Sequence, residues 1–229
     1  MIVVTYEQHT PEWFAARRGL PTASKFASII MPKKREYAAA ADAYINALID
    51  ELARPVEAEA ESFAGNRHTR RGEMLEPEAL GAYAFDRGNL RLQRVGLVLS
   101  PCRRFGCSPD ALVGADGLVQ AKAPDGHTFV RWFREFKRTG ALPDEHKPQV
   151  HGELIITGRQ WSDFVAHCPG YPQLVIRVER DEFTAALERN MELFHRDYTA
   201  ALELFELRHP GPELEALPWP PIPNGGQHE

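Results

Sequence analysis

Residues 105–124 read FGCSPDALVGADGLVQAKAP, and this stretch decides which fold the rest of the chain is expected to adopt. Its two apolar runs, ALV and LVQA, are joined by Gly-Ala-Asp-Gly, and Asp-Gly is a strong signal for a tight β-hairpin turn. Side chains alternate along a strand, so Gln120 and Lys122 share one face, and Asp110 precedes the first strand on the same side. The stretch therefore predicts a carboxylate, an amide and an ammonium group around a common point.

This arrangement resembles the nuclease core of the PD-(D/E)xK superfamily, in which an Asp and a following Glu-x-Lys gather a divalent metal and a Lys around a scissile phosphate. Here the Asp is Asp110, and Gln120-Ala121-Lys122 stands where the superfamily has Glu-x-Lys. The resemblance implies an α/β (α+β) fold with a restriction-endonuclease-like core, in which helices flank a central mixed β-sheet. A neutral amide replaces one acidic side chain of that core.

Within the superfamily, the chain is most similar to the phage lambda exonuclease family, also called YqaJ-like viral recombinases. Four groups of residues carry this resemblance in the same order along the chain: Trp13, Arg17 and residues 22–24; residues 72–76; residues 107–110 through 122–124; and residues 148–150. It implies a processive exonuclease that digests one strand of duplex DNA from its 5′ end and leaves a 3′ overhang. It also implies a homotrimeric ring around the DNA and a single-strand annealing protein as partner.

The resemblance also implies the residue roles. Mg²⁺, or Mn²⁺ in its place, would bind Asp110, Gln120 and the backbone carbonyl of Ala121, with Glu76 assisting a second metal ion. Lys122 would orient or activate the attacking water. The residues implied to bind the 5′ phosphate or the scissile phosphate are Arg17, Ser24, Ser108 and Gln149. By themselves, Ser24 is equally compatible with an ordinary first-turn residue of a helix, and Glu76 with an exposed helix residue.

The chemistry agrees with these roles independently of the resemblance. Hydrolysis of a phosphodiester requires stabilised charge on the phosphoryl oxygens and a water of lowered pKa, and an oxygen-bound Mg²⁺ supplies both. A lysine is suited to activating water because its pKa shifts readily on burial.

Gln120 predicts a weakened site. An amide can offer an oxygen to Mg²⁺, but it brings no negative charge, so we expect weak Mg²⁺ binding and severely reduced cleavage. The fold and the grip on DNA should survive, because Glu and Gln have nearly the same shape. Two explanations are open: a Glu-to-Gln substitution introduced to trap substrate in an otherwise active enzyme, or a natural variant with altered metal use.

The net charge of −5 is unevenly distributed along the chain. Residues 1–138 contain 20 Lys and Arg against 17 Asp and Glu, whereas residues 139–229 contain 7 against 15. A locally basic surface suits an enzyme that grips phosphates at one place, since affinity for nucleic acid grows with each phosphate contact. Charged runs are also typical of ordinary solvated surfaces, so charge alone does not establish DNA binding.

With 229 residues, of which 43% are hydrophobic and 26% charged, the chain is typical of a large globular domain. No apolar run approaches the roughly 20 residues of a membrane span, and the N-terminus lacks the features of a signal peptide. We therefore expect a cytoplasmic protein without a membrane partner, and the resemblance implies a phage or prophage protein in a bacterial host. The three cysteines contain no Cys-x-x-Cys pair and are expected to be reduced thiols.

A single nuclease domain is expected over residues 1–209, followed by a tail over residues 210–229 that holds six of the 18 prolines. Hydrophobic periodicity and capping signals predict the elements of the domain. Besides the hairpin, strands are predicted at residues 2–6, 90–100, 161–167 and 174–178. Helices are predicted at residues 11–18, 23–30, 37–53, 67–85, 127–138, from 146 onward, and at 181–208.

Three other functions remain compatible with the sequence. A restriction-type endonuclease would cut within closed circular DNA, whereas the proposed exonuclease needs an end. A non-catalytic DNA-end-binding protein with a decayed site would regain no activity when Gln120 is changed to Glu. A plain α/β scaffold with accidental matches would have to match four ordered groups of residues by chance.

Overall fold

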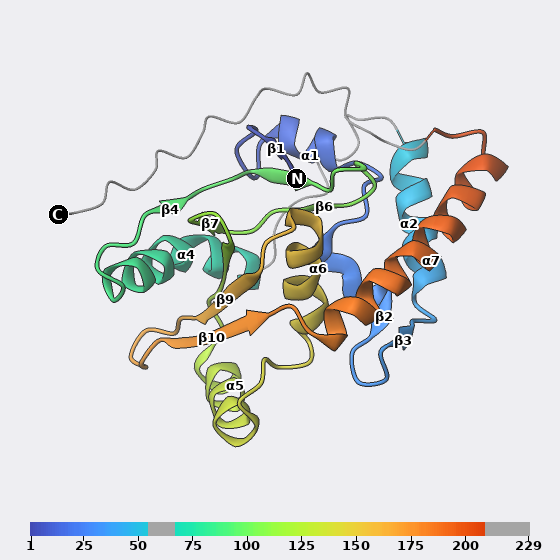
Figure 1. Ribbon diagram of the computed structural model, residues 1–229. Coiled ribbons are helices and arrows are strands. Elements are labelled where there is room, and N and C mark those ends of the chain that lie inside the picture. Colours follow the sequence, from blue (N-terminus) through green and yellow to red (C-terminus); the bar gives the residue numbers. More distant parts are fainter. Residues whose placement is uncertain (55–66, 209–229) are drawn as a thin grey trace.

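The computed structural model describes residues 1–54 and 67–208, and the fold is a mixed sheet with helices on both faces (Figure 1). The predicted tail lies outside the described residues. The helices are α1 Pro11–Arg17, the 3-10 helix η1 Ala23–Ser28, α2 Ala41–Ala53, α4 Arg67–Phe85, α5 Gly126–Thr139, α6 Lys147–Thr157 and α7 Glu182–Leu204. The strands are β1 Ile2–Val4, β2 Ile30–Met31, β3 Glu36–Tyr37, β4 Leu92–Gln93, β5 Leu97–Leu99, β6 Gly106–Cys107, β7 Ala111–Val113, β8 Gly117–Lys122, β9 Trp161–Ala166 and β10 Leu174–Glu179.

The central sheet has the strand order β10-β9-β8-β7-β4. Strands β8 and β9 pair in parallel, and the other neighbours pair antiparallel, so the predicted mixed sheet is confirmed. Beside it lies a three-stranded sheet of order β1-β5-β6. The chain passes from the small sheet to the central one within residues 108–110, between the end of β6 and the start of β7.

Alternation along the strands divides the core between the two faces of the central sheet. On one face, Val119 and Ala121 pack against Leu80 and Tyr83 of α4. On the other face, Leu118 belongs to a larger cluster with side chains of η1, α2, α5, α6 and α7. Even-numbered residues of β8 therefore point toward the side that α6 covers.

A buried carboxylate ties α4 to the sheet. Asp163 of β9 accepts a hydrogen bond from the Tyr83 hydroxyl at 2.8 Å and two from the Arg177 guanidinium of β10, from Nε at 2.5 Å and from Nη2 at 3.0 Å. The Arg177 guanidinium also stacks 3.7 Å from the ring centroid of Trp161. This network joins three elements and fixes the position of the helix that carries Glu76.

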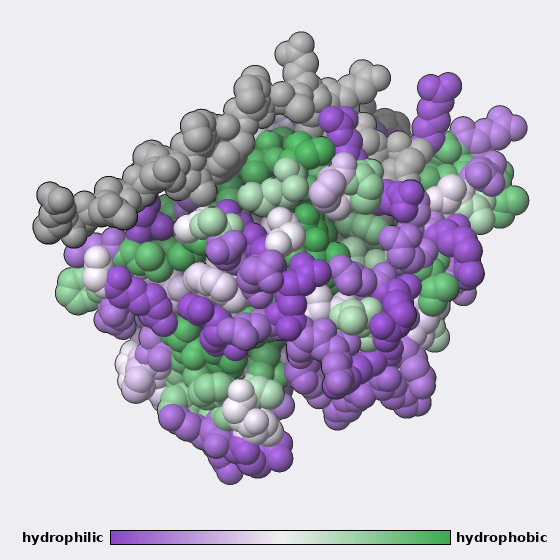
Figure 2. Space-filling model, viewed as in Figure 1, coloured by the Kyte–Doolittle hydropathy of each residue, from purple (hydrophilic) through white to green (hydrophobic). Residues whose placement is uncertain are grey.

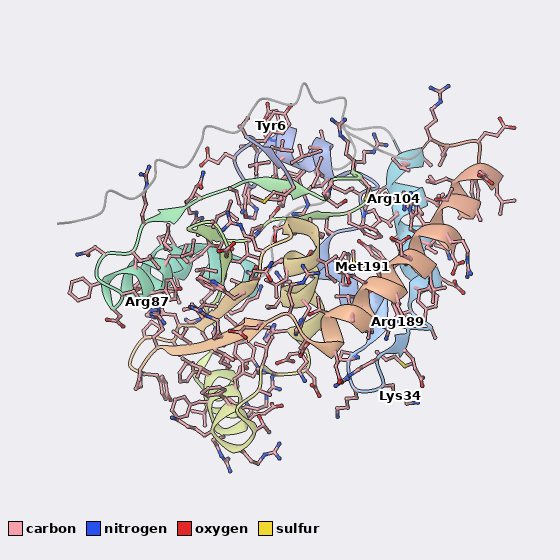
Figure 3. The ribbon with its side chains drawn as sticks, viewed as in Figure 1. Tyr6, Lys34, Arg87, Arg104, Arg189 and Met191 are labelled. Atoms are coloured by element: carbon pink, nitrogen blue, oxygen red, sulfur yellow. The ribbon has the colours of Figure 1, made fainter. Side chains whose placement is uncertain are left out.

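The outer helix α7 is amphipathic. Met191 is buried against the core, while Arg189 lies on the exposed side (Figure 3). Hydrophilic side chains gather over the β2–β3 ribbon and the neighbouring part of α7 (Figure 2). Among them, Arg35 and Glu182 form an ion pair at 2.9 Å, which joins the ribbon to the start of α7.

Several predicted boundaries are wrong. The expected strand over residues 90–100 is two short strands in different sheets, because the chain bends at Gly96, where a Cβ would lie 1.5 Å from the Tyr6 carbonyl oxygen. The expected helix over residues 23–30 is a 3-10 helix that ends at Ser28, because the chain then enters the β2–β3 ribbon. For the same reason the next helix begins at Ala41.

Candidate active site

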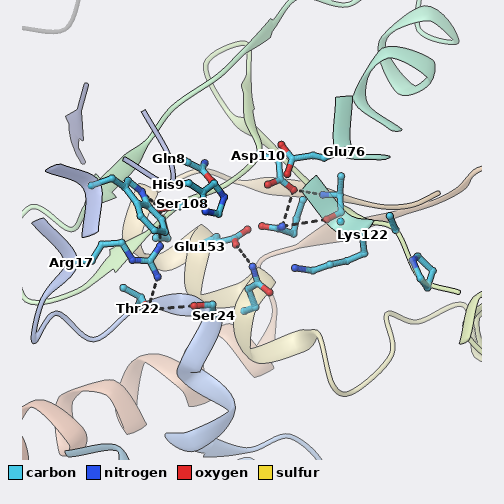
Figure 4. A pocket seen from close by; sticks show the side chains of 18 of the residues that line it. Gln8, His9, Arg17, Thr22, Ser24, Glu76, Ser108, Asp110, Lys122 and Glu153 are labelled. Carbon is cyan, nitrogen blue, oxygen red and sulfur yellow. Dashed lines mark hydrogen bonds between the residues drawn. The ribbon is translucent and has the colours of Figure 1, made fainter. Parts of the chain in front are cut away.

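A cavity of about 630 Å³ lies where the two sheets meet (Figure 4). It brings together all nine residues to which the sequence assigned a role: Arg17, Ser24, Glu76, Ser108, Asp110, Gln120, Ala121, Lys122 and Gln149. These residues come from α1, η1, α4, the link between the sheets, β8 and α6. Their convergence is a property of the fold, and their individual roles stay predictions.

Asp110 and Gln120 are hydrogen-bonded to each other. The Gln120 amide donates from Nε2 to Asp110 Oδ2 at 2.8 Å, and the backbone N–H of Ala121 donates to the same oxygen at 2.6 Å. Both side chains are buried, with 5% and 3% exposure. The amide oxygen of Gln120 is buried and has no hydrogen-bond partner among the described residues. Strand β8 and the link before β7 therefore hold two oxygen-bearing side chains together, and the amide oxygen is unsatisfied.

Burial controls the charge of Asp110. Loss of solvation raises its pKa to about 7, and the nearby Glu76 carboxylate adds to the rise. The Lys122 ammonium and the Ala121 N–H act in the opposite direction by stabilising the ionised form. Burial thus favours the protonated form of this carboxyl group, and a bound cation would favour the ionised form.

Glu76 reaches the cavity from α4 but is already paired. Its carboxylate forms an ion pair with Arg94 at 2.5 Å, and its side chain is 25% exposed. In Figure 4, Glu76 lies beside Asp110, and Lys122 extends along the other side of the cavity. The sequence prediction of a nearby additional acid is met in position, but its charge is balanced by Arg94.

A second group of side chains forms an anion-binding corner. The Arg17 guanidinium donates to Ser108 Oγ at 3.3 Å and to Thr22 Oγ1 at 3.4 Å, and it stacks 4.0 Å from the centroid of the Trp13 ring. Burial lowers the pKa of Arg17 to about 10, so it stays charged at neutral pH. The hydroxyl groups of Thr22 and Ser24 are 3.3 Å apart. A half-buried cation beside several hydroxyl groups is suited to hold a phosphate.

Glu153 is a cavity residue that the sequence analysis missed. It lies on α6, is 1% exposed, and accepts a hydrogen bond from Gln149 Nε2 to its Oε1 at 3.0 Å. Its Oε2 is buried without a hydrogen-bond partner among the described residues. Burial raises the pKa of Glu153 to about 8, and Asp110 contributes to the rise. An acid within the otherwise apolar run GELII was the available signal, because such an acid on a buried helix needs a partner.

The oxygens of this cavity fit a divalent cation of the class that binds hard ligands. The Asp110 carboxylate, the Ala121 carbonyl and the unsatisfied oxygens of Gln120 and Glu153 are donors that suit Mg²⁺ or Mn²⁺. In the part of the chain that the structure describes, no group of three or more His, Cys, Asp and Glu side chains is placed to hold a metal ion. The oxygens of an amide and of a backbone carbonyl lie outside that count, and they are the donors that Gln120 and Ala121 contribute here.

Comparisons with known proteins agree with this geometry. The family described as YqaJ-like viral recombinase domain matches residues 12–160. The alkaline exonuclease LHK-Exo from Laribacter hongkongensis is 32% identical, with a TM-score of 0.70 over 86% of this chain and 96% of that chain. LHK-Exo in complex with dAMP has a TM-score of 0.69 at the same identity and coverage.

A phage related exonuclease from Haemophilus somnus 129PT is 14% identical, with a TM-score of 0.60 over 81% of this chain and 96% of that chain, and it shares the fold. No curated protein matches the chain. None of the helices in the described ranges is long and apolar enough to cross a membrane. The family match spans all nine predicted site residues, and together with the LHK-Exo likeness it confirms the resemblance: the chain is a nuclease that belongs to the YqaJ-like viral recombinase family.

Proposed function

We propose that the protein is a Mg²⁺-dependent 5′-to-3′ exonuclease that digests one strand of linear duplex DNA and leaves a 3′ overhang for recombination by strand annealing. The observation that carries this proposal is the junction of two sites in one cavity. The corner of Arg17 and Ser108 is suited to a terminal phosphate, and it adjoins the acidic site of Asp110 and Lys122. Such a cavity supports cleavage next to a held strand end.

The residues of the chain would divide the work as follows. Arg17, Ser24 and Ser108 would hold a phosphate of the strand end, and Gln149 would contact the same strand. Lys122 would orient or activate the attacking water, and its ammonium would stabilise the negative charge that develops on the water as it loses its proton. When bound by Asp110, Gln120 and the Ala121 carbonyl, Mg²⁺ supplies charge stabilisation to the phosphoryl oxygens and lowers the pKa of the attacking water.

Gln120 makes this chain a weakened member of its family. The amide donates a hydrogen bond to Asp110 and contributes no negative charge. The proposal is that cleavage is reduced for this reason, whether Gln120 is an introduced substitution or a natural variant. Restoring the acid through Gln120→Glu is expected to raise Mg²⁺-dependent hydrolysis by at least roughly 10- to 100-fold, because mutating a residue that only hydrogen-bonds a metal ligand already has an effect of this size.

The test is digestion of linear duplex DNA by the parent chain and by Gln120→Glu, each with a 5′ phosphate or a 5′ hydroxyl on the substrate. The Gln120→Glu protein should release nucleotides from the 5′ end, and it should be faster on the phosphorylated substrate because Arg17 and Ser108 then bind a charged group. Equal rates for the two proteins would overturn the assignment of residue 120 as a metal ligand.

Closed circular duplex separates the rival functions. An exonuclease leaves circular DNA intact, so cutting of the circle would favour a restriction-type endonuclease. A non-catalytic DNA-end-binding protein would bind the linear duplex and remain inactive as Gln120→Glu with Mg²⁺ or Mn²⁺.

Family membership supports the remaining parts of the proposal. We expect a homotrimeric ring that surrounds duplex DNA, a single-strand annealing protein as partner, and action in the cytoplasm of a bacterial host as a phage or prophage protein. Light scattering of the purified protein tests the assembly, because a monomer and a trimer differ threefold in mass.

A further inference from the structure

Glu153 is a buried acid with one free oxygen in the proposed metal site. Gln149 donates to its Oε1, which leaves the buried Oε2 without a hydrogen-bond partner among the described residues. An isolated buried carboxylate is unfavourable unless a cation or a set of hydrogen bonds compensates it. The side chain lines the same cavity as Asp110, and Figure 4 places it between Asp110 and the corner that holds Arg17.

The fold places the side chains of Glu153 and Gln120 on facing sides of the same cavity. Leu118, two residues before Gln120 on β8, packs in one cluster with Val150 and Leu154 of α6. Residues two apart on a strand share a face, so Gln120 also points to the side of the sheet that α6 covers. Its amide oxygen and the carboxylate of Glu153 are both buried and both lack a partner in the described structure. Two unsatisfied oxygens thus face one cavity from a strand and from a helix.

The electrostatics join Glu153 to the same site. The ammonium of Lys122 acts on the carboxyl groups of both Asp110 and Glu153, and the two carboxyl groups repel each other. Glu76, another acid of the cavity, differs because its charge is already compensated by Arg94. A bound cation would favour the ionised form of Glu153, which would then supply at position 153 the negative charge that position 120 lacks.

We infer that Glu153 is a metal ligand of this site and supplies from α6 the negative charge that the amide at position 120 lacks. The ligand set would combine the carboxylates of Asp110 and Glu153 with the amide oxygen of Gln120 and the carbonyl of Ala121. This inference rests on the proposed function, since it concerns the cation of that site. It identifies the protein as a variant whose second acidic ligand comes from a helix.

The test measures Mn²⁺ binding without DNA, by electron paramagnetic resonance of the free ion. Glu153→Gln should weaken binding about 10-fold or more. Glu188→Gln is the matched control, because it makes the same change at a half-exposed position of α7, and it should leave the affinity unchanged. Glu76→Gln should change the affinity less than Glu153→Gln, because Arg94 already neutralises Glu76. In the Gln120→Glu protein the loss caused by Glu153→Gln should shrink to about threefold or less.

Equal Mn²⁺ affinity of the parent and a folded Glu153→Gln protein would overturn the inference. A second measurement needs no variant: anomalous scattering from a parent crystal soaked in Mn²⁺ should place the ion within roughly 2.0 to 2.6 Å of oxygens of both Asp110 and Glu153. An ion bound by Asp110 without Glu153 would also overturn it. Digestion of linear DNA by Gln120→Glu reports on the proposed function separately, because that protein carries its own acid at position 120.

Discussion

Tyr83→Phe tests the buried network that holds α4 against the sheet. The mutation removes one hydroxyl group, which donates to Asp163 at 2.8 Å from a fully buried ring. A hydrogen bond to a charged group contributes about 1.5–3 kcal/mol. Arg177 Nη2 still donates to the same Asp163 oxygen at 3.0 Å, so this oxygen keeps a hydrogen-bond donor after the mutation. We therefore expect the lower part of this range, about 1.5–2 kcal/mol of lost unfolding free energy.

Urea unfolding in the presence of a chelator measures this loss of free energy, and thermal unfolding under the same conditions measures the change in melting temperature. For a chain of this length, each kcal/mol corresponds to about 2–4 °C, so the melting temperature should fall by roughly 3–8 °C. The control is the same mutation in an Asp163→Asn background, where the acceptor is neutral and the loss should fall to about 1 kcal/mol or less. A loss below about 0.5 kcal/mol, or an equal loss in both backgrounds, would refute the view that the charged acceptor fixes α4.

Three further predictions concern the cavity and its supports. With metal removed by a chelator, ionisation of Glu153 should destabilise the protein. The pKa of Glu153 is about 8 in the folded state and 4.5 ordinarily, so the folded state holds the proton more tightly than the unfolded state. The free energy of unfolding should therefore fall as the pH rises between these two values, by at most roughly 4–5 kcal/mol. The pKa of Asp110 is also raised by burial and adds to this decline, so Glu153→Gln should reduce the decline without abolishing it in urea unfolding curves recorded from pH 5 to 8. An unchanged slope would contradict the burial argument. Gly152→Ala should lower the unfolding free energy by about 1–3 kcal/mol despite the better helix propensity of Ala, because the added Cβ would lie 2.4 Å from the ring of the buried Phe26. A gain in stability measured by calorimetry would show that η1 can shift to make room for the added methyl group of α6. Arg17→Ala in the Gln120→Glu background should slow digestion of 5′-phosphorylated duplex roughly tenfold and affect the 5′-hydroxyl substrate much less; equal losses on both substrates would place Arg17 outside the phosphate site.

The sequence predicted the local elements that carry the chemistry. The hairpin of β7 and β8 and the bounds of α4 follow from short-range signals, namely a Gly-Ala-Asp-Gly turn and an apolar stripe that ends near Gly88. The resemblance then supplied the order in which distant residues meet. Arg17 and Ser108 are far apart in the sequence, and local patterns alone do not place them 3.3 Å apart.

The errors came from tertiary contacts that leave little trace in the sequence. The bend at Gly96 depends on the carbonyl of Tyr6, a residue that is distant in the chain. Glu153 was missed because the matching residues of α6 ended at Val150, and because its significance depends on the neighbouring amide of Gln120. A buried acid becomes recognisable only when the space it faces is known.

The link over residues 108–110 fixes the distance between the proposed phosphate corner and the proposed metal site. Ser108 belongs to the corner that is suited to a phosphate, Asp110 belongs to the proposed metal site, and Pro109 stiffens the backbone between them. The Cα atoms of Ser108 and Asp110 can be at most about 7–8 Å apart, because only two Cα–Cα steps separate them. Inserting one residue into this link should shift the position of cleavage along the DNA strand rather than abolish cleavage, since the link is held at each end by a different sheet.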